Sequence, residues 1–125
     1  MNKFGIIVII VTVLILGGGA YFLTKPQKPV DVPQREANVY EYYWGNGCPH
    51  CKVVEDFINS WDKKNTIKLT KYEVWYDKVN AKIMEDRYNS CTEKPQDQMA
   101  VPFLITPDGK CLVGDGPIID LFKSL

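Results

Sequence analysis

A pair of cysteines separated by two residues, Cys48 and Cys51, constrains this chain more than any other feature. The aromatic run at 40–44 before them is typical of a β-strand, and the amphipathic run at 53–61 after them is typical of an α-helix. The cysteines therefore lie where a predicted strand gives way to a predicted helix. A Cys-x-x-Cys pair at such a junction predicts a site of thiol–disulfide exchange.

The N-terminal region carries an uncharged, mostly apolar run at 4–23, about as long as a helix that crosses a bilayer. The run is either a membrane anchor or a signal peptide with a small-residue cleavage site at Gly18-Gly19-Ala20. Its apolar character continues past that site, which favours the anchor. Lysines flank both ends, so charge does not decide the orientation. Either interpretation predicts a domain on the extracytoplasmic side of the cell membrane.

Composition divides the chain into three parts. Residues 1–24 form the predicted anchor or signal peptide, and residues 25–37 contain prolines 26, 29 and 33, which indicate an extended linker. Residues 38–125 are expected to form one folded domain. The chain has 15 basic and 15 acidic side chains, so it lacks the basic surface typical of nucleic-acid-binding proteins, and we expect no such partner.

Hydrophobic patterning within 38–125 predicts the order β-α-β-α-β-β-α, an α/β domain. Asp77 is expected to cap the second helix, and Pro107-Asp108-Gly109 to form a turn between two strands. Strands are expected at 38–44, 72–76 (beginning as early as Ile67), 101–106 and 110–113. Helices are expected at 49–63, at 78–88 and from Gly116-Pro117 to the C-terminus. The side chains expected to face the core from these helices are Val53, Val54, Phe57, Ile58, Trp61, Val79, Ile83, Met84, Ile118, Leu121, Phe122 and Leu125.

Residues 38–125 resemble the thioredoxin-like superfamily. The resemblance rests on the aromatic strand leading into Cys48-Pro49-His50-Cys51, the Val101-Pro102 step and the closing hairpin with its helix. It implies a thioredoxin-like fold, a central mixed four-stranded sheet flanked by helices, here preceded by one N-terminal transmembrane helix. The Pro-His dipeptide is similar to that of the DsbA family of periplasmic disulfide oxidases. The compact length is more similar to a membrane-tethered glutaredoxin or thioredoxin.

The expected chemistry follows from the position of the cysteines. At a helix N-terminus, free N–H groups and the helix dipole favour the thiolate form of Cys48, and a nearby His50 ring would add to this effect. Pro49 and His50 therefore favour an oxidising or isomerising thiol–disulfide oxidoreductase, with Cys48 attacking and Cys51 resolving. A membrane-tethered reductase is the first alternative. Expected partners are protein thiol or disulfide substrates and a membrane or soluble redox partner, with no cofactor beyond the redox-active disulfide.

Other interpretations of the cysteine pair are weaker. A zinc site needs further ligands at close spacing, but Cys91 and Cys111 stand alone, so we expect no metal. Covalent haem needs a histidine directly after the second cysteine, where Lys52 stands. A purely structural Cys48–Cys51 bridge would close a very short loop. A metal-binding or redox-inert thioredoxin-like binding module remains an alternative from another functional class.

The resemblance also assigns roles outside the motif. It implies that Pro102 is cis and lies against the dithiol, with Val101 offering its backbone to substrate; the alternative is an ordinary proline that begins a strand. It further implies that Cys91 and Cys111 meet at the end of the domain remote from Cys48. Three possibilities stay open for them: a structural disulfide, two free buried thiols or a second redox relay.

One position departs from the resembled family. Thioredoxins and DsbA usually keep a buried acid six residues before the first cysteine, where it accepts a proton from the second. Tyr42 stands at this position here, and Glu41 beside it should point to the other face of the sheet. Either Glu41 substitutes or the proton leaves through water, so the sequence leaves the general base for Cys51 open.

Overall fold

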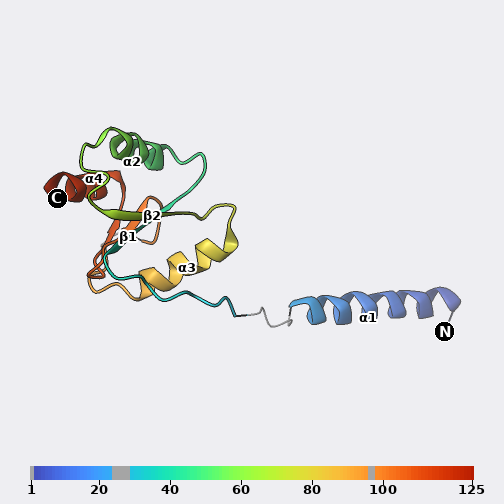
Figure 1. Ribbon diagram of the computed structural model, residues 1–125. Coiled ribbons are helices and arrows are strands. Elements are labelled where there is room, and N and C mark those ends of the chain that lie inside the picture. The colour runs from blue at the N-terminus through green and yellow to red at the C-terminus, as the bar shows by residue number, and fades with distance from the viewer. Residues whose placement is uncertain (1, 24–28, 96–97) are drawn as a thin grey trace.

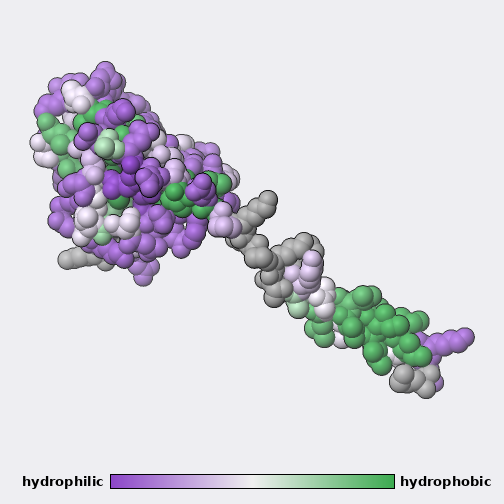
Figure 2. Space-filling model, turned by 60° about the horizontal axis from the view of Figure 1, so that its bottom comes forward, coloured by the Kyte–Doolittle hydropathy of each residue, from purple (hydrophilic) through white to green (hydrophobic). Residues whose placement is uncertain are grey.

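The computed structural model describes residues 2–23, 29–95 and 98–125. The predicted junction between anchor and linker at residues 24–25, and residues 96–97 of a predicted loop, lie outside this range. Helix α1 (Lys3–Leu23) is long and apolar enough over Lys3–Tyr21 to cross a membrane, and none of that window is buried. Figure 2 shows the hydrophobic surface of this helix, in contrast to the mainly hydrophilic visible face of the domain. A signal sequence has the same properties, so α1 is compatible with both interpretations.

The domain is built on a mixed four-stranded sheet in the order β2-β1-β3-β4. Strand β1 (Val39–Trp44) pairs in parallel with β2 (Lys68–Glu73) and antiparallel with β3 (Phe103–Ile105), which pairs antiparallel with β4 (Cys111–Val113). Helices α2 (Pro49–Ser60) and α4 (Asp115–Ser124) cover one face, and α3 (Lys78–Asn89) covers the other (Figure 1). This mixed sheet with flanking helices fits the α/β, thioredoxin-like architecture expected from the sequence.

Alternation along β1 divides the apolar residues into two cores. Tyr43 points toward α3 and packs with Ile83, whereas Tyr42 points toward the other face and packs with Val54 and Phe122. Neighbouring side chains in an extended strand point to opposite faces, so a strand covered by helices on both sides needs apolar residues at both sets of positions. The aromatic run that marked this strand in the sequence meets that need.

Several predicted boundaries shift. Strand β2 covers Lys68–Glu73, so Trp75 and Tyr76, predicted to belong to it, lie beyond its end and are 46% and 76% exposed. The β-propensity of these aromatic residues suggested a longer strand, but both lie on the surface after the strand and do not pair in the sheet. Helix α2 ends at Ser60 rather than near residue 63, and β3 is shorter than predicted because it begins only after Pro102.

Three side chains predicted to face the core are instead exposed: Val53, Val79 and Leu125. Val79 lies in the first turn of α3 and Leu125 is the last residue of the chain, so both occupy helix ends beyond the close packing. Pro117, expected at the first helical position, is the third residue of α4, which Gly114 precedes as N-cap. The Asp77 cap is confirmed, since its carboxylate accepts hydrogen bonds from the amides of residues 79 and 80.

Part of the predicted linker lies on the domain. Val32 packs against the core on the α3 side. The Pro33 carbonyl accepts a hydrogen bond of 2.6 Å from the Arg87 guanidinium, and the Arg35 guanidinium donates to the Thr106 carbonyl. Residues 32–35 therefore contribute to the folded unit, and the linker boundary at residue 37 stays a prediction.

Candidate active site

The two cysteines of the motif form a disulfide at the N-terminus of α2, with their Cα atoms 5.2 Å apart. The chain turns sharply out of β1, and Gly47 takes a positive φ of 91° that side chains disfavour. The Cys48 amide donates to the Gly45 carbonyl at 3.0 Å, which closes this turn. Pro49 then begins α2 at a position where a missing N–H costs no helical hydrogen bond.

Cys48 is the N-cap residue of α2. Its Sγ accepts a hydrogen bond of 3.1 Å from the Cys51 amide, one of the amides that a helix N-terminus leaves without a backbone partner. This bond and the positive end of the helix dipole stabilise negative charge on the Cys48 sulfur. Cys48 is 7% exposed and Cys51 is 3% exposed, so Cys48 is the more accessible, although less open than an exposed attacking sulfur would be.

A second loop reaches the disulfide from the start of β3. The Val101–Pro102 peptide bond is cis, the isomer that the resemblance implies. The Val101 carbonyl oxygen lies 4.0 Å from the Cys48 Sγ, so the backbone before the proline faces the sulfur. The Pro102 carbonyl accepts a hydrogen bond of 2.9 Å from the Gly114 amide, which ties this loop to the start of α4.

The His50 ring is bound to the first residue of α4. Its Nδ1 lies 3.1 Å from the Asp115 carboxylate, and the side chain is 71% exposed. The hydrogen bond from His50 holds the pKa of the Asp115 carboxyl below its ordinary value. From the sequence, a His50 ring near the sulfur was expected to stabilise the thiolate. Its pairing with Asp115 was not predicted, because the two residues are distant in the chain. Asp115 offsets part of the positive charge that a protonated ring would bring to Cys48.

Glu73, at the end of β2, organises the loops around the disulfide, a role that the sequence did not predict. Its carboxylate accepts hydrogen bonds of 2.9–3.1 Å from the amides of Asn46, Trp75, Tyr76 and Asp77. Desolvation raises the pKa of the Glu73 carboxyl, but the four backbone donors together lower it below its ordinary value. One carboxylate thus joins the loop before Cys48 to the exposed aromatic loop after β2. An acid at a strand end carries no sequence signal for this role.

A hollow of about 750 Å³ opens beside the disulfide, between α2 and the β2 side of the sheet. The Tyr42 hydroxyl donates to the Cys51 carbonyl at 3.3 Å, and burial raises the pKa of Tyr42 far above its ordinary range. Glu55 of α2 and Lys71 of β2 form an ion pair of 2.7 Å across the hollow. The polar and titratable side chains that line it include those of Tyr42, Cys51, Lys52, Glu55, Asp56, Lys71 and Glu73.

Glu41 points away from this hollow, as expected from strand alternation. It is buried on the α3 face, where its carboxylate pairs with the Arg87 guanidinium at 2.8 Å and accepts a hydrogen bond of 2.7 Å from the Tyr43 hydroxyl. Arg87 and Tyr43 therefore engage Glu41 on the face opposite α2. Of the two routes left open by the sequence, the one through Glu41 has no geometric support.

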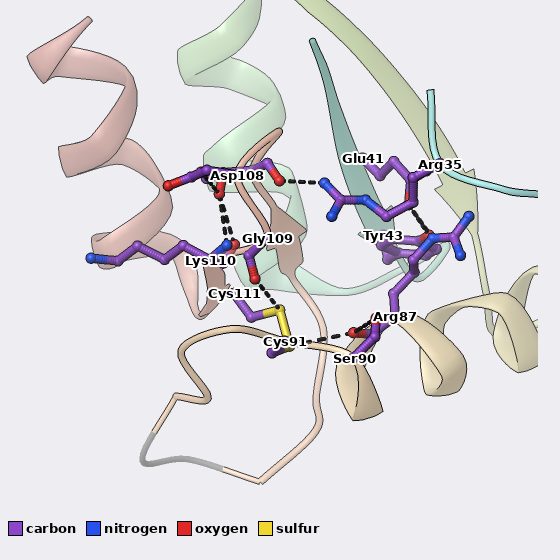
Figure 3. Close-up of a disulfide and its surroundings, with 11 residues drawn as sticks. Arg35, Glu41, Tyr43, Arg87, Ser90, Cys91, Asp108, Gly109, Lys110 and Cys111 are labelled. Atoms are coloured by element: carbon purple, nitrogen blue, oxygen red, sulfur yellow. Dashed lines mark hydrogen bonds and ion pairs between the residues drawn. A yellow bond between two sulfur atoms is a disulfide. The ribbon is translucent and has the colours of Figure 1, made fainter. Parts of the chain in front are cut away.

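Cys91 and Cys111 are joined by a disulfide with a Cα separation of 5.7 Å (Figure 3). Cys91 follows the end of α3, and Cys111 begins β4 opposite Ile105, the last residue of β3. Since β3 runs antiparallel to β1, this bridge lies at the end of the sheet remote from Cys48. Figure 3 shows it beside the end of α3, where the Cys91 Sγ lies 3.4 Å from the Arg87 carbonyl oxygen. In the described residues, no three His, Cys, Asp or Glu side chains form a group that could hold a metal ion.

Comparison with known proteins finds one short match, to a DsbA protein. The chain is 38% identical over 47 residues to the thiol:disulfide interchange protein DsbA of Burkholderia cepacia, a match that covers 38% of this chain and 22% of that protein. No family model matches the chain, and no solved structure matches it. The match is local and spans about a fifth of that relative's length. Together with the Cys48–Cys51 disulfide, it is consistent with a thioredoxin-like protein.

Proposed function

We propose that the protein is a membrane-anchored, extracytoplasmic oxidoreductase that exchanges disulfides with protein thiols through Cys48 and Cys51. The observation that carries the proposal is the convergence of a helix-capping disulfide with the Val101–Pro102 step, whose carbonyl lies 4.0 Å from Cys48 Sγ. An incoming client strand could pair with the Val101 backbone while its cysteine reaches the disulfide. The local similarity to DsbA supports protein thiols as the substrate class.

The exchange uses two displacements. A client thiolate attacks Cys48 Sγ, the Cys48–Cys51 bond breaks, and Cys51 leaves with the electron pair. A second client thiolate then attacks the client sulfur of the mixed disulfide, forms the client disulfide and releases Cys48 as a thiolate. The helix N-terminus stabilises this last leaving group. The client loses two electrons and the Cys48–Cys51 pair gains them.

We favour the oxidising or isomerising direction because the site stabilises a Cys48 thiolate. The Cys51 amide at 3.1 Å and the helix dipole stabilise the reduced form, which makes the disulfide a stronger oxidant. A helix terminus contributes up to about 2 kcal/mol, and about 1.4 kcal/mol corresponds to about 30 mV for a two-electron couple. The amide hydrogen bond and the helix dipole therefore both favour donation of disulfides to clients over reduction of client disulfides.

The proposed location rests on α1 and on the compatibility of an extracytoplasmic domain with the DsbA similarity. Intact cells carrying the protein should be treated with a mild reductant and then with a membrane-impermeant thiol reagent. Labelling of Cys48 is expected without cell lysis. Labelling that requires lysis would contradict the proposed side of the membrane.

The reduction potential of the Cys48–Cys51 pair decides the direction. The full chain in detergent should be equilibrated with glutathione buffers and its thiols alkylated and counted by mass, with Cys91→Ala/Cys111→Ala isolating the active pair. We expect a potential well above that of thioredoxin, which is about −270 mV. A value near or below −270 mV would exclude the oxidising direction and favour a membrane-tethered reductase.

The exchange mechanism itself has a separate test. Cys51→Ser removes the resolving sulfur, so mixed disulfides between Cys48 and client proteins should accumulate and disappear on reduction. Cys48→Ser should form far fewer adducts, since Cys51 is the less accessible sulfur. The absence of adducts in Cys51→Ser would contradict exchange through Cys48 and favour a redox-inert binding module.

A further inference from the structure

Exchange through Cys48 and Cys51 requires a proton to leave the Cys51 thiol before this sulfur can attack a mixed disulfide, because the thiolate is the nucleophile. Cys51 is 3% exposed, so bulk solvent has little direct access to it. The strand residue that faces it is Tyr42, a phenol whose pKa burial raises far above its ordinary range. Glu41 is engaged by Arg87 and Tyr43 on the opposite face. Neither Tyr42 nor Glu41 on β1 therefore offers Cys51 a proton acceptor.

Glu55 is the carboxylate that the fold places on the same side as Cys51. It follows Cys51 by four residues on α2, and side chains at this spacing lie above one another on one helix face. Both residues line the hollow of about 750 Å³ beside the disulfide. That volume holds water with space to spare, so a water can connect the carboxylate to the sulfur.

Lys71 holds Glu55 over this hollow. Lys71 pairs with its carboxylate at 2.7 Å from the β2 side, and the register places Lys71 directly opposite Tyr42. The Tyr42 hydroxyl in turn donates to the Cys51 carbonyl at 3.3 Å. After burial, the negative charge of Glu55 is the next cause that raises the pKa of Tyr42, so the carboxylate acts electrostatically on the group that contacts Cys51.

We propose that Glu55 accepts the proton of the Cys51 thiol across this hollow and returns it when Cys51 leaves as a thiolate. The proposal rests on the proposed function, because it concerns a step of that exchange. The resembled family carries its proton-accepting carboxylate on the strand, at the position of Tyr42. In this chain Glu55 would supply the carboxylate from α2.

The step balances as follows. In a mixed disulfide, Cys48 is bonded to a client or redox-partner sulfur, Cys51 is a thiol and Glu55 is a carboxylate. The Cys51 proton passes to Glu55, directly or through one water, and the thiolate attacks Cys48 Sγ. The Cys48–Cys51 bond forms, the Cys48–partner bond breaks, and the partner sulfur leaves as a thiolate that takes up one proton from solvent. In the reverse step, protonated Glu55 returns its proton to the departing Cys51.

Ionisation of the thiol sets the pH range of the effect. The ordinary pKa of a cysteine thiol is about 8.5. Above that pH a thiol ionises without a proton acceptor, so the carboxylate should no longer speed resolution. The groups that line the hollow with Glu55 are Lys52, Asp56 and Cys51 from α2, Tyr42 from β1, and Lys71 and Glu73 from β2.

The test measures formation and decay of the mixed disulfide separately. The reduced full chain in detergent is mixed with glutathione disulfide, quenched with acid at intervals between pH 5.5 and 9, and analysed by mass. Formation reports attack by Cys48, and decay reports resolution by Cys51. We expect Glu55→Gln to slow decay at least tenfold near pH 6.5, to match wild type near pH 9 and to leave formation unchanged.

Two further variants separate proton transfer from loss of an ion pair. Lys71→Met breaks the same pair but keeps the carboxylate, so decay should stay within about threefold of wild type across the pH range. Glu85→Gln removes the carboxylate of an ion pair of equal length, 2.7 Å to Lys82, on α3, and should change neither rate. Glu55→Asp keeps a carboxylate on a side chain one carbon shorter. Its mixed disulfide should decay faster than that of Glu55→Gln, which gives a second test of the carboxylate if Glu55→Gln folds poorly.

The outcomes distinguish this inference from the proposed function. Equal decay of Glu55→Gln and wild type at all pH values would overturn the role of Glu55 while leaving exchange intact. Equal slowing in Lys71→Met and Glu55→Gln would show that the ion pair only supports α2. Failure of wild type to form any adduct would instead contradict the proposed function.

Discussion

The indole of Trp75 lies directly against the backbone of Gly45: a Cβ built on Gly45 would fall 2.3 Å from the ring carbon Cδ2. Trp75 belongs to the loop after β2, and Gly45 to the turn that delivers Cys48. The ring therefore covers the active-site turn only because residue 45 has no side chain. The disulfide loop and the aromatic loop pack as one unit.

This packing predicts the effect of Gly45→Ala. The added methyl group must displace the Trp75 ring, and such overpacking costs about 1–3 kcal/mol in free energy of unfolding. Urea denaturation followed by circular dichroism measures the loss. Gly116→Ala is the matched control, since nothing lies within 4 Å of a Cβ at Gly116. Equal stability of both variants would contradict the close packing of Trp75 on Gly45.

The lowered pKa of Glu73 predicts how these loops respond to acid. Four amides donate to its carboxylate, so the ionised form stabilises the loops above the ordinary pKa of 4.5, and this stabilisation is lost as the pH falls through the lower folded value. The amide proton signals of Asn46 and Tyr76 in NMR spectra should titrate together with a midpoint below 4.5. The same signals in Glu73→Gln should not titrate in this range. A midpoint at or above 4.5 would contradict the arrangement.

The buried ion pair predicts that Glu41 matters for stability and not for exchange. Glu41→Gln leaves the Arg87 charge without its partner in the core, and breaking a buried pair from one side costs about 3–5 kcal/mol. The double variant Glu41→Leu/Arg87→Met removes both charges and should recover much of that loss in urea denaturation. Below the unfolding transition, Glu41→Gln should resolve mixed disulfides at the wild-type rate. Slow resolution by folded Glu41→Gln would return the proton-acceptor role to this strand.

The remote disulfide predicts a stabilising role. Cys91 and Cys111 are 20 residues apart, and a bridge over a loop of this size contributes about 3 kcal/mol. Cys91→Ala/Cys111→Ala should unfold at a lower urea concentration while keeping the reduction potential of the Cys48–Cys51 pair. Loss of exchange activity in the folded double variant would instead indicate a second redox relay.

The contact between His50 and Asp115 predicts a small effect of His50 on the potential. The exposed ring faces a carboxylate, so it adds less positive charge to the Cys48 sulfur than an unpaired histidine would. His50→Ala should make the potential more negative, by less than the roughly 30 mV that about 1.4 kcal/mol represents. Asp115→Asn, which leaves the ring without the acid, should move it in the opposite direction. A fall of far more than 30 mV in His50→Ala would show that the ring acts directly on the sulfur.

Local patterns in the sequence were sufficient for much of the fold. The strand before Cys48, the helix after it, the cap at Asp77 and the turn at residues 107–109 depend on residues within a few positions of one another. The orientation of Glu41 followed from the two-residue repeat of a strand. The ends of β2 and α2 could not be predicted from local patterns. They depend on tertiary packing around Trp75 and Trp61 rather than on propensity.

The sequence by itself determined that a cysteine pair stands between a strand and a helix, because both elements are specified locally. Only the tertiary structure decided what surrounds the pair. Glu73 meets the turn at Asn46, His50 meets Asp115, and Glu55 meets Lys71 across the hollow. The partners in each contact are between 16 and 65 residues apart in the chain. Sheet register and helix packing bring them together, and no local pattern carries that information.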